Sequence, residues 1–416
     1  MFELADAGTL GFDDERLARI APFLAKTYID SGRLPNAQLV IARDGQPVHY
    51  TKLGSMGDDK RELRNDALFR IASMTKPVTS IAFMQLVEQC EVALEEPVAR
   101  IFPEFADLKV YAGGGGAIPF APGKPASAMR FVDLLTHMSG LTYGLQNRNN
   151  IDAAYRENNF DFARDHLDSD AFIEKLSKLP LEFAPGTGWN YSVSTDVLGV
   201  AVERISGMRL GDYFEKHIFA PLGMTDTHFG VAEGQSERLV DAYAYQPGHA
   251  PKMINAGATS KLNEPGAFDS GGGGLIGTIA DYHRFSTMLL NGGDLDGARI
   301  VSPKTIRLMR TNHLPNNADL TEMSSSLFSE ANNAGTGFGL GFAMVIDPSK
   351  TLMPSSEGEF YWGGAYSTAF FVDPVERITM VFMTQVYPSS TYPIRRQLKT
   401  LIYSALTDSY ADGDRP

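Results

Sequence analysis

The chain has 416 residues, a formal net charge of −13 and a hydrophobic fraction of 43%, with 25 Phe and 16 Tyr. This length and apolar content favour a well-folded globular protein with a large core, arranged in two lobes. The negative charge makes nucleic acid and anionic membranes poor partners, because both are bound through an excess of Lys and Arg. No apolar run approaches the length that a membrane-spanning helix needs, so we expect no membrane partner either.

The N-terminus and the cysteine content favour a reducing compartment. The first residues lack a basic stretch followed by an apolar one, so no signal peptide is expected. Cys90 is the only cysteine, which excludes an internal disulfide. The eight histidines are scattered, without the spacing of a metal-binding helix. We therefore expect a cytoplasmic protein with no metal and no other cofactor.

The N-terminal residues predict a helix followed by a β-hairpin. Residues 12–31 carry apolar side chains at helical spacing, although Pro22 is expected to kink the helix. An Asp44-Gly45 pair then separates two β-rich runs within residues 37–51. Such a pair between two strands is a strong short-range signal for a hairpin.

The middle of the chain, residues 97–265, is rich in helix and turn signals. Residues 146–168 are polar with interspersed aromatic side chains, which is typical of a flap over a cleft and equally of an ordinary surface loop. The glycine run 271–274 follows no clear strand, so we interpret it as a tight turn before a helix capped by Thr278. Helices are expected at residues 131–137, 169–178, 193–206 and 210–217.

The C-terminal part returns to strands and ends in a helix. Strands are expected at residues 338–346, 367–372 and 378–384, and the last helix at residues 394–406. With the N-terminal hairpin, these strands predict one antiparallel sheet flanked by the terminal helices. We therefore predict an α/β domain from residues 1–75 and 270–416, a mainly helical domain from residues 76–269, and a functional cleft between them.

A serine and a lysine three residues apart, Ser73 and Lys76, precede a buried helix predicted at residues 78–91. On a helix these two positions share a face, so the amine can supply the base that a serine nucleophile needs. The spacing alone is more often a helix-capping serine followed by a solvated lysine. Because Pro77 has no N–H to donate to the Ser73 carbonyl, we expect either an irregular first turn or another partner for that carbonyl.

Two later glycine-rich stretches offer the remaining parts of an acyl-transfer site. Tyr191 follows the turn at residues 185–190, and a tyrosine beside a lysine ammonium can act as a base because the positive charge favours its phenolate. Gly363 and Gly364 are expected to open a strand, where a backbone N–H approaches a ligand closely. By itself, each stretch is more simply explained as an ordinary aromatic side chain or an ordinary strand start.

In this order and spacing, the three stretches resemble the serine β-lactamase-fold hydrolases of the class C β-lactamase and DD-peptidase type, whose nucleophile motif is Ser-x-x-Lys. The closest likeness is to the family VIII carboxylesterases. It covers nearly the whole chain and implies a β-lactamase/penicillin-binding-protein-like fold, α/β plus all-α. The supporting motifs are Phe69–Lys76, Leu134–Leu141, Pro185-Gly186 before Tyr191-Ser192, Pro221–Met224 and Gly271–Gly273.

The resemblance also implies roles for individual residues. Ser73 would be the nucleophile, Lys76 its proton partner and Tyr191 the general base and acid. The backbone N–H groups of Ser73 and Ala365 would form the oxyanion hole. The residues expected to contact the substrate are Val193, Trp362, Gly363 and Gly364.

Two departures from the class C pattern bear on the substrate. Val193 stands where class C β-lactamases carry the asparagine of Tyr-x-Asn, and Trp362-Gly363-Gly364 stands in place of Lys-Thr-Gly. These changes remove the groups that would recognise an amide side chain and a carboxylate. The predicted function is therefore a carboxylesterase acting on small to medium acyl esters, with a small-molecule ester as its partner. A β-lactamase or DD-peptidase, an acyltransferase and a non-catalytic binding protein on the same fold remain alternatives.

Overall fold

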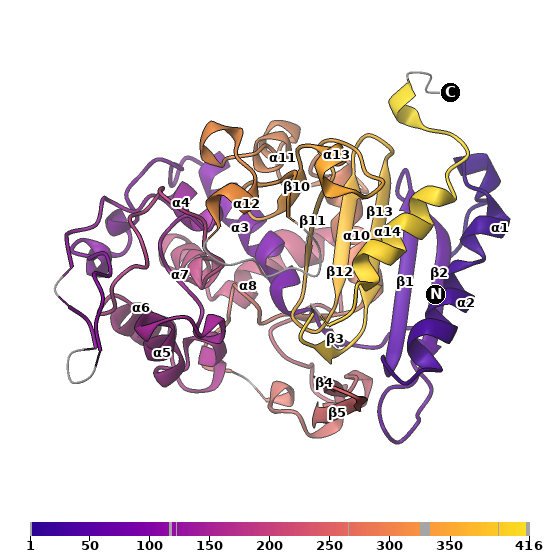
Figure 1. Cartoon of the computed structure of the whole chain (residues 1–416), viewed down its shortest axis with the longest axis horizontal. Helices are drawn as coiled ribbons and strands as arrows, with labels where there is room; N and C mark the ends of the chain where they lie inside the picture. Colours follow the sequence, from indigo (N-terminus) through magenta and orange to yellow (C-terminus); the bar gives the residue numbers. More distant parts are fainter. Residues whose placement is uncertain are drawn as a thin grey trace.

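The computed structural model describes residues 2–115, 119–121, 123–264, 266–324, 333–389 and 391–412. A seven-stranded antiparallel sheet, in the order β2-β1-β13-β12-β11-β10-β9, lies beside a helical region, on the right and the left of Figure 1 respectively. Its strands are β1 (Asn36–Arg43), β2 (Gln46–Gly54), β9 (Thr336–Phe338), β10 (Ala343–Val345), β11 (Phe360–Gly363), β12 (Ala369–Asp373) and β13 (Ile378–Met383).

The predicted N-terminal hairpin is confirmed, and it joins the C-terminal strands as expected. Asp44 and Gly45 both have positive φ, 52° and 77°, which gives the two-residue turn between β1 and β2 its hairpin geometry. On its other side β1 pairs with β13, with Val40 opposite Val381. The sheet therefore joins strands from the N-terminal and the C-terminal parts of the chain.

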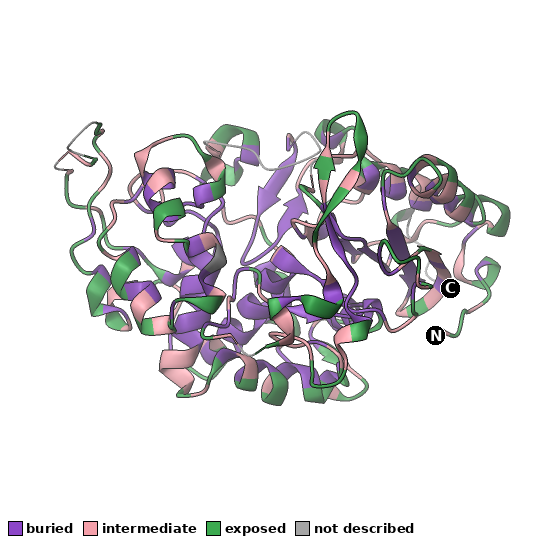
Figure 2. Ribbon diagram, turned by 90° about the horizontal axis from the view of Figure 1, so that it is seen from below, coloured by how far each residue is buried: buried purple, intermediate pink, exposed green. Residues whose placement is uncertain are grey.

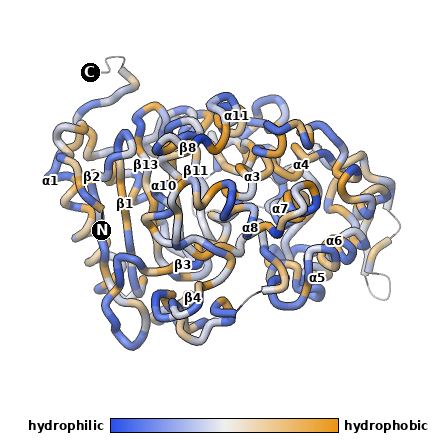
Figure 3. Tube along the Cα trace, turned by 180° about the vertical axis from the view of Figure 1, so that it is seen from behind, coloured by the Kyte–Doolittle hydropathy of each residue, from blue (hydrophilic) through white to orange (hydrophobic). Residues whose placement is uncertain are grey.

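Each face of the sheet carries its own hydrophobic core, because successive side chains on a strand point to opposite faces. Leu39 and Ile41 belong to the core under the terminal helices, whereas Val40 belongs to the larger core on the other face. Figure 1 shows α14 in front of the sheet, and Figure 3, from behind, shows α10 on the opposite face. The covering helices are α1 (Asp14–Leu17), α2 (Ile20–Leu24) and α14 (Ile394–Ser404) on one face and α10 (Ile279–Leu290) on the other.

The helical region is built around α3 (Thr75–Glu88), whose side chains are buried almost throughout and which packs against α7 (Ser194–Ser206). Figure 2 shows this buried interior continuing into the sheet. The helices predicted in this region, at residues 78–91, 131–137, 169–178, 193–206 and 210–217, are confirmed with shifted ends. Within the described residues, no helix has the length and apolar character needed to span a membrane. The surrounding helices are α4 (Phe131–Leu135), α5 (Asn150–Glu157), α6 (Ser169–Leu176), α8 (Leu210–Phe214) and α9 (Ala220–Leu222).

Small sheets and short helices connect the two regions. Strand β3 (Phe69–Arg70) pairs with β6 (Ile276–Gly277), which brings the chain before Ser73 next to the glycine run 271–274. Strands β4 and β5 lie inside the segment predicted as the helical domain, and the proposed domain boundaries stay a prediction. The remaining elements are β4 (Ala242–Gln246), β5 (His249–Asn255), β7 (Asp294–Leu295), β8 (Ala298–Arg299), β14 (Val386–Tyr387), α11 (Pro303–Met309), α12 (Leu320–Met323) and α13 (Pro348–Thr351).

Two strand predictions were wrong because glycine turns interrupt the chain. The single strand expected at residues 338–346 is the hairpin β9–β10, in which Gly341 has a φ of 105° and Gly339 N–H donates to Phe342 O at 2.9 Å. Gly363 ends β11 rather than opening a strand, and Gly364 begins the turn to β12. Because β9 and β10 are buried throughout, no alternating pattern of apolar and polar residues marks the turn between them.

Two helical segments also differ from expectation. The helix predicted over residues 12–31 is divided into α1, α2 and a π-helical turn, η2 (Ala25–Ile29). Residues 146–168 are not a loop: they contain α5 and the 3₁₀ segment η7 (Phe160–Asp165). Helix α5 packs Ile151 and Tyr155 into the core, and its Asn149 cap, rather than its composition, starts it.

Candidate active site

A sharp turn between β3 and α3 presents Ser73. The 3₁₀ segment η3 (Ala72–Met74) precedes the α-helix, which confirms the irregular first turn predicted from Pro77. Ala72 has a φ of 46°, a conformation that non-glycine residues rarely adopt and that concentrates at functional sites. Ile71 and Met74 are buried on either side, whereas Ser73 keeps part of its surface exposed to a cavity.

The Lys76 ammonium is buried beside Ser73, with only 1% of the residue exposed. Its Nζ donates to Gly272 O at 2.6 Å, to Tyr143 Oη at 3.0 Å and to Ser73 Oγ at 3.3 Å. It also lies 4.6 Å from the centroid of the Tyr191 ring. The structure therefore brings the predicted Ser73, Lys76 and Tyr191 together, and it adds Tyr143 and Gly272 to them.

These contacts fit both protonation states of the lysine. As an ammonium, Lys76 has three N–H donors for its three oxygen neighbours. As a neutral amine it keeps two N–H groups for Gly272 O and Tyr143 Oη and turns its lone pair to Ser73 Oγ. The arrangement can thus take a proton from the serine and return it without moving the side chain.

Tyr143 and Asp196 form a polar layer behind the lysine. Burial, together with the negative charge of Asp196, raises the pKa of Tyr143 well above its ordinary value, so its hydroxyl stays protonated. Burial also raises the pKa of Asp196, while the positive charge of Lys76 opposes that rise. Asp196 accepts from Ser270 Oγ at 2.5 Å and from Gly272 N–H at 3.0 Å. This carboxylate therefore fixes the glycine whose carbonyl binds the lysine.

Aromatic rings surround Tyr191. The Trp362 ring lies 5.4 Å away between centroids, Tyr143 lies at 5.2 Å and His137 at 5.0 Å. Burial, with a smaller contribution from the charge of Lys76, lowers the pKa of His137 well below its usual value, so this ring is neutral. His137 therefore adds no positive charge near Lys76.

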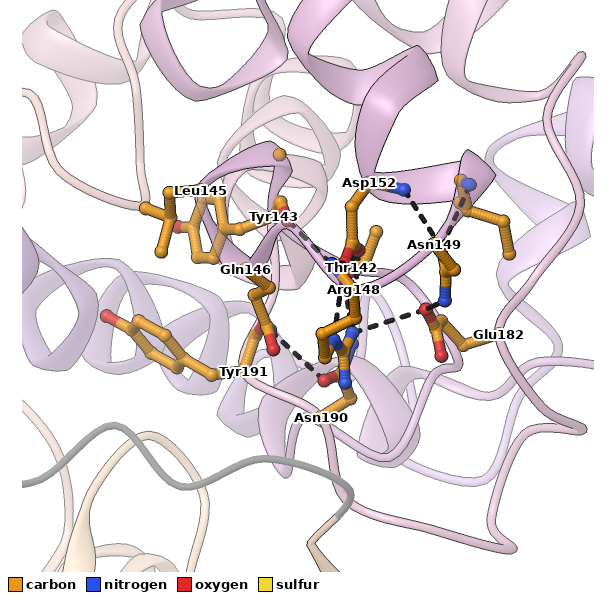
Figure 4. Close-up of polar contacts among 12 residues, drawn as sticks. Thr142, Tyr143, Leu145, Gln146, Arg148, Asn149, Asp152, Glu182, Asn190 and Tyr191 are labelled. Atoms are coloured by element: carbon orange, nitrogen blue, oxygen red, sulfur yellow. Dashed lines mark hydrogen bonds and ion pairs between the residues drawn. The ribbon is translucent and has the colours of Figure 1, made fainter.

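The backbone of Tyr191 is tied to the segment that the sequence indicated as a possible flap. Gln146 Nε2 donates to Tyr191 O at 2.6 Å and to Asn190 Oδ1 at 3.1 Å (Figure 4). Two residues on, Arg148 pairs with buried Asp152 at 3.2 Å. Figure 4 shows these contacts to the right of the Tyr143 and Tyr191 rings, with Gln146 nearest to the rings. The start of residues 146–168 therefore supports the backbone of the site.

A cavity of about 680 Å³ opens over Ser73. Trp362, Gly363, Gly364 and Ala365 line it, together with Tyr143 and Tyr191. Aromatic and aliphatic side chains contribute much of the remaining wall, among them Leu145, Trp189, Leu262, Leu275 and Phe370, and charged side chains such as Arg70, Arg164 and Lys261 line it as well. Such a lining suits a mainly apolar ligand that also meets polar groups.

Val193 departs from the expectation that it contacts the substrate. It is fully buried and is not among the residues that line the cavity. As the residue that precedes α7, it turns inward, and its N–H donates to Thr142 O at 3.2 Å. Tyr191, two residues earlier, faces the cavity instead.

The turn from β11 to β12 carries Ala365 next to the Ser73 turn. Ser367 N–H donates to Gly364 O at 3.0 Å and closes the turn, with Ala365 at its second position. Thr368 Oγ1 donates to Ile71 O at 3.3 Å, so the turn is joined to the chain just before Ser73. No described residue accepts a hydrogen bond from the Ala365 N–H. The N–H of Ser73 lies in the first turn of its helix, where backbone donors lack intrahelical acceptors.

Three polar contributors were missed by the sequence analysis. Tyr143 follows the Leu134–Leu141 motif by two residues, and Asp196 follows Tyr191 by five. Both therefore lie next to motifs that the sequence does indicate. Gly272 was interpreted as part of a turn and of the Gly271–Gly273 motif, without a role at the site. Its carbonyl could not be assigned to Lys76 from spacing, because the contact joins residues 196 positions apart.

The chain belongs to the beta-lactamase family, whose sequence profile matches residues 20–403. It is a serine hydrolase of that family, and the resemblance drawn from its motifs is confirmed. It is 32% identical to "Esterase EstB" of Burkholderia gladioli over 89% of this chain and 91% of the relative. It is 35% identical to "Protein Rv1367c" of Mycobacterium tuberculosis over 86% of this chain and 88% of the relative.

The fold is likewise shared with solved structures. The structure of "EstCE1, a hydrolase with promiscuous acyltransferase activity" superposes on this chain with a TM-score of 0.75 and 26% sequence identity. It covers 95% of this chain and 99% of that one. The predicted β-lactamase/penicillin-binding-protein-like fold is confirmed.

Proposed function

We propose that this chain is a carboxylesterase that hydrolyses small to medium acyl esters through an acyl-enzyme at Ser73. The observation that carries the proposal is the buried Lys76 amine, 3.3 Å from Ser73 Oγ, beneath an apolar cavity walled by Trp362. Trp362 stands where class C β-lactamases carry the lysine of Lys-Thr-Gly, and an apolar ester has no carboxylate that would need such a cation. The name of the relative EstB supports the same activity.

In the proposed reaction, Ser73 Oγ attacks the ester carbonyl carbon while its proton passes to Lys76. The N–H groups of Ser73 and Ala365 stabilise the oxyanion of the tetrahedral intermediate. The bond to the alcohol oxygen breaks as Tyr191 gives that oxygen its phenol proton and becomes a phenolate beside the Lys76 ammonium. Water then attacks the acyl-enzyme carbonyl and passes its proton to the Tyr191 phenolate, and Lys76 returns its proton to Ser73 Oγ as the bond to the acyl group breaks.

A panel of p-nitrophenyl esters tests this proposal on wild type and Ser73→Ala. We expect wild type to hydrolyse butyrate and hexanoate esters and the variant to lose at least about 10³-fold in kcat, since the nucleophile is absent. A fluorophosphonate should add to Ser73 in wild type alone, as seen by mass spectrometry. Unchanged ester hydrolysis in Ser73→Ala would refute the mechanism.

The same preparations separate the alternatives within the family. A chromogenic cephalosporin assayed beside the esters distinguishes an esterase from a β-lactamase. Turnover of the lactam above that of every ester would overturn the esterase assignment. Weak lactam turnover is compatible with it, because both substrates need the same acyl-enzyme.

Acyl transfer is a second candidate activity, because EstCE1, a protein 26% identical to this chain, is described as a hydrolase with promiscuous acyltransferase activity. An acyl-enzyme passes its acyl group to an alcohol when the alcohol replaces water in the second step. Product analysis with a vinyl ester and an added primary alcohol decides the question. A new ester product indicates transfer, and free acid alone indicates hydrolysis.

A further inference from the structure

An arginine on the C-terminal helix, Arg395, donates hydrogen bonds to the turn that carries Ala365. Arg395 lies in the first turn of α14, on the face of the sheet opposite α10. Its Nη2 donates to Thr368 O at 2.9 Å and to Gly364 O at 3.2 Å. These two carbonyls stand at the two ends of the β11–β12 turn. One guanidinium therefore spans the whole turn.

The guanidinium also leaves no room for a side chain on the strand end. A Cβ added to Gly363 would overlap the Cζ and both Nη atoms of Arg395. A Cβ added to Gly364 would overlap Ile71 O and Thr368 Oγ1 on the other side. The two glycines thus let the turn fit between the arginine and the chain that leads into Ser73.

Hydrogen bonds continue from the arginine towards both proposed oxyanion donors. Gly364 N–H donates to Thr368 O at 2.9 Å, so one carbonyl receives both the guanidinium and the turn's own backbone. Thr368 then donates through Oγ1 to Ile71 O, two residues before Ser73. Ala365 and Ser73 are therefore fixed relative to each other through the same few contacts.

We propose that Arg395 is a positioning residue that holds the Ala365 N–H in line with the Ser73 N–H, an inference that rests on the proposed acyl-transfer function. It touches neither the nucleophile nor the oxyanion. Preorganised donors stabilise a transition state because they need not reorient as charge develops, and a displacement of about 1 Å can cost about 10²-fold in rate.

Arginine suits this position better than lysine does. A planar guanidinium can lie flat against Gly363 while its N–H groups fork to two carbonyls, whereas an ammonium is a compact point charge on a flexible stem. Arg395→Lys should consequently recover only part of the wild-type rate. The Arg395→Ala variant leaves a space that a small guanidinium compound can fill from the cavity, which Arg395 lines.

The test measures the second-order rate of fluorophosphonate addition to Ser73, which needs the oxyanion donors but no particular ester. We expect Arg395→Ala to slow this addition about 10- to 100-fold. It should lower kcat for p-nitrophenyl butyrate by a similar factor, with KM changed less than about threefold because ground-state contacts remain. Methylguanidine should restore part of both rates.

Arg16→Met is the matched control, because Arg16 Nη1 donates to Ser404 O at 3.1 Å at the far end of the same helix. It should lower the Tm as Arg395→Ala does and leave the addition rate unchanged. Should Arg395→Ala fail to fold, Gly363→Ala displaces the guanidinium instead and is expected to slow addition comparably.

The outcomes separate the two proposals. A lower Tm with an unchanged addition rate in Arg395→Ala would mean that Arg395 only joins helix to sheet, which overturns the inference. Slowed addition in a protein that hydrolyses no ester would leave Arg395 as a positioning residue and refute the esterase function alone.

Discussion

At the scale of residues, Lys76 is flanked by two tyrosines in different ways. The amine lies over both rings, 5.2 Å from the centroid of Tyr143 and 4.6 Å from that of Tyr191, and it also donates to the Tyr143 hydroxyl at 3.0 Å. Burial and the charge of Asp196 hold the Tyr143 proton in place by raising its pKa. A hydroxyl that keeps its proton suits a supporting role and leaves the moving proton to Tyr191.

Substitution of each tyrosine by phenylalanine tests that division. Tyr143→Phe removes one acceptor of the amine, and we expect about a tenfold loss of kcat, the scale of a hydrogen bond to a charged group. Tyr191→Phe removes the proposed proton carrier, for which about 10²- to 10⁴-fold is expected. Steady-state kinetics on p-nitrophenyl butyrate compares them. The reverse order of severity would transfer the carrier role to Tyr143.

At the scale of elements, the site joins a helix start, a glycine turn and a strand end. Asp196, in the first turn of α7, binds Gly272 N–H, and Gly272 O binds Lys76. A Cβ on Gly272 would overlap the Asp196 carboxylate. The small size of this glycine, rather than its backbone freedom, is what the contact requires.

Gly272→Ala should therefore push the Gly272 carbonyl away from Lys76. We expect a loss of about tenfold or more in kcat and a fall in Tm, because a buried charged hydrogen-bond network is disturbed. Gly273→Ala is the matched control, since its nearest atom, Ala72 C, lies 3.9 Å from an added Cβ. Equal kinetics for the two variants would contradict the role given to Asp196 and Gly272.

What the sequence predicted well at this scale was local. Thr278 accepts from Asp281 N–H at 3.2 Å and starts α10 as expected, and Asp44-Gly45 forms its turn. Ser73 and Lys76 also stand in one helical turn. The antiparallel sheet flanked by terminal helices was predicted from the pattern of the strands and helices, whereas the fold family and the role of Tyr191 followed from motifs shared with known hydrolases.

What the sequence did not predict depends on distant packing. Arg395 meets Gly364 across 31 residues, and nothing in its own neighbourhood distinguishes it from Arg396. The inward turn of Val193 follows from the packing of α7. Helix α5 was missed because it spans only eight residues, and the positions between its buried apolar residues Ile151, Ala154 and Tyr155 are mostly polar.

At the scale of the whole molecule, burial of histidines couples stability to pH. Burial lowers the pKa of His49 and of His283 to about 4 from an ordinary 6.5. Below pH 6.5 the unfolded chain binds protons that the folded one refuses, so this contribution to stability is complete above 6.5 and is lost as the pH falls towards 4. His137 acts in the same direction.

His283→Gln isolates one such contribution. Between pH 7 and pH 5, wild type should lose about 2 kcal/mol more of its unfolding free energy than the variant does, since one pKa unit corresponds to about 1.4 kcal/mol. Urea unfolding at the two pH values measures this difference, and buried carboxyl groups common to both proteins cancel. Parallel losses in the two proteins would show that His283 titrates normally.

The pairing of β1 with β13 has a consequence for the order in which a growing chain acquires its activity. Ser73, Lys76 and Tyr191 all leave the ribosome long before β13 does, yet β1 has β2 as its only neighbour until then. Closing a sheet across more than three hundred residues is slow, because the entropy of loop closure must be overcome first. The nascent protein thus carries its proposed proton carriers before the β11–β12 turn, which carries Ala365, is held in the sheet. The proposed ester hydrolysis should begin only once α14 has been made.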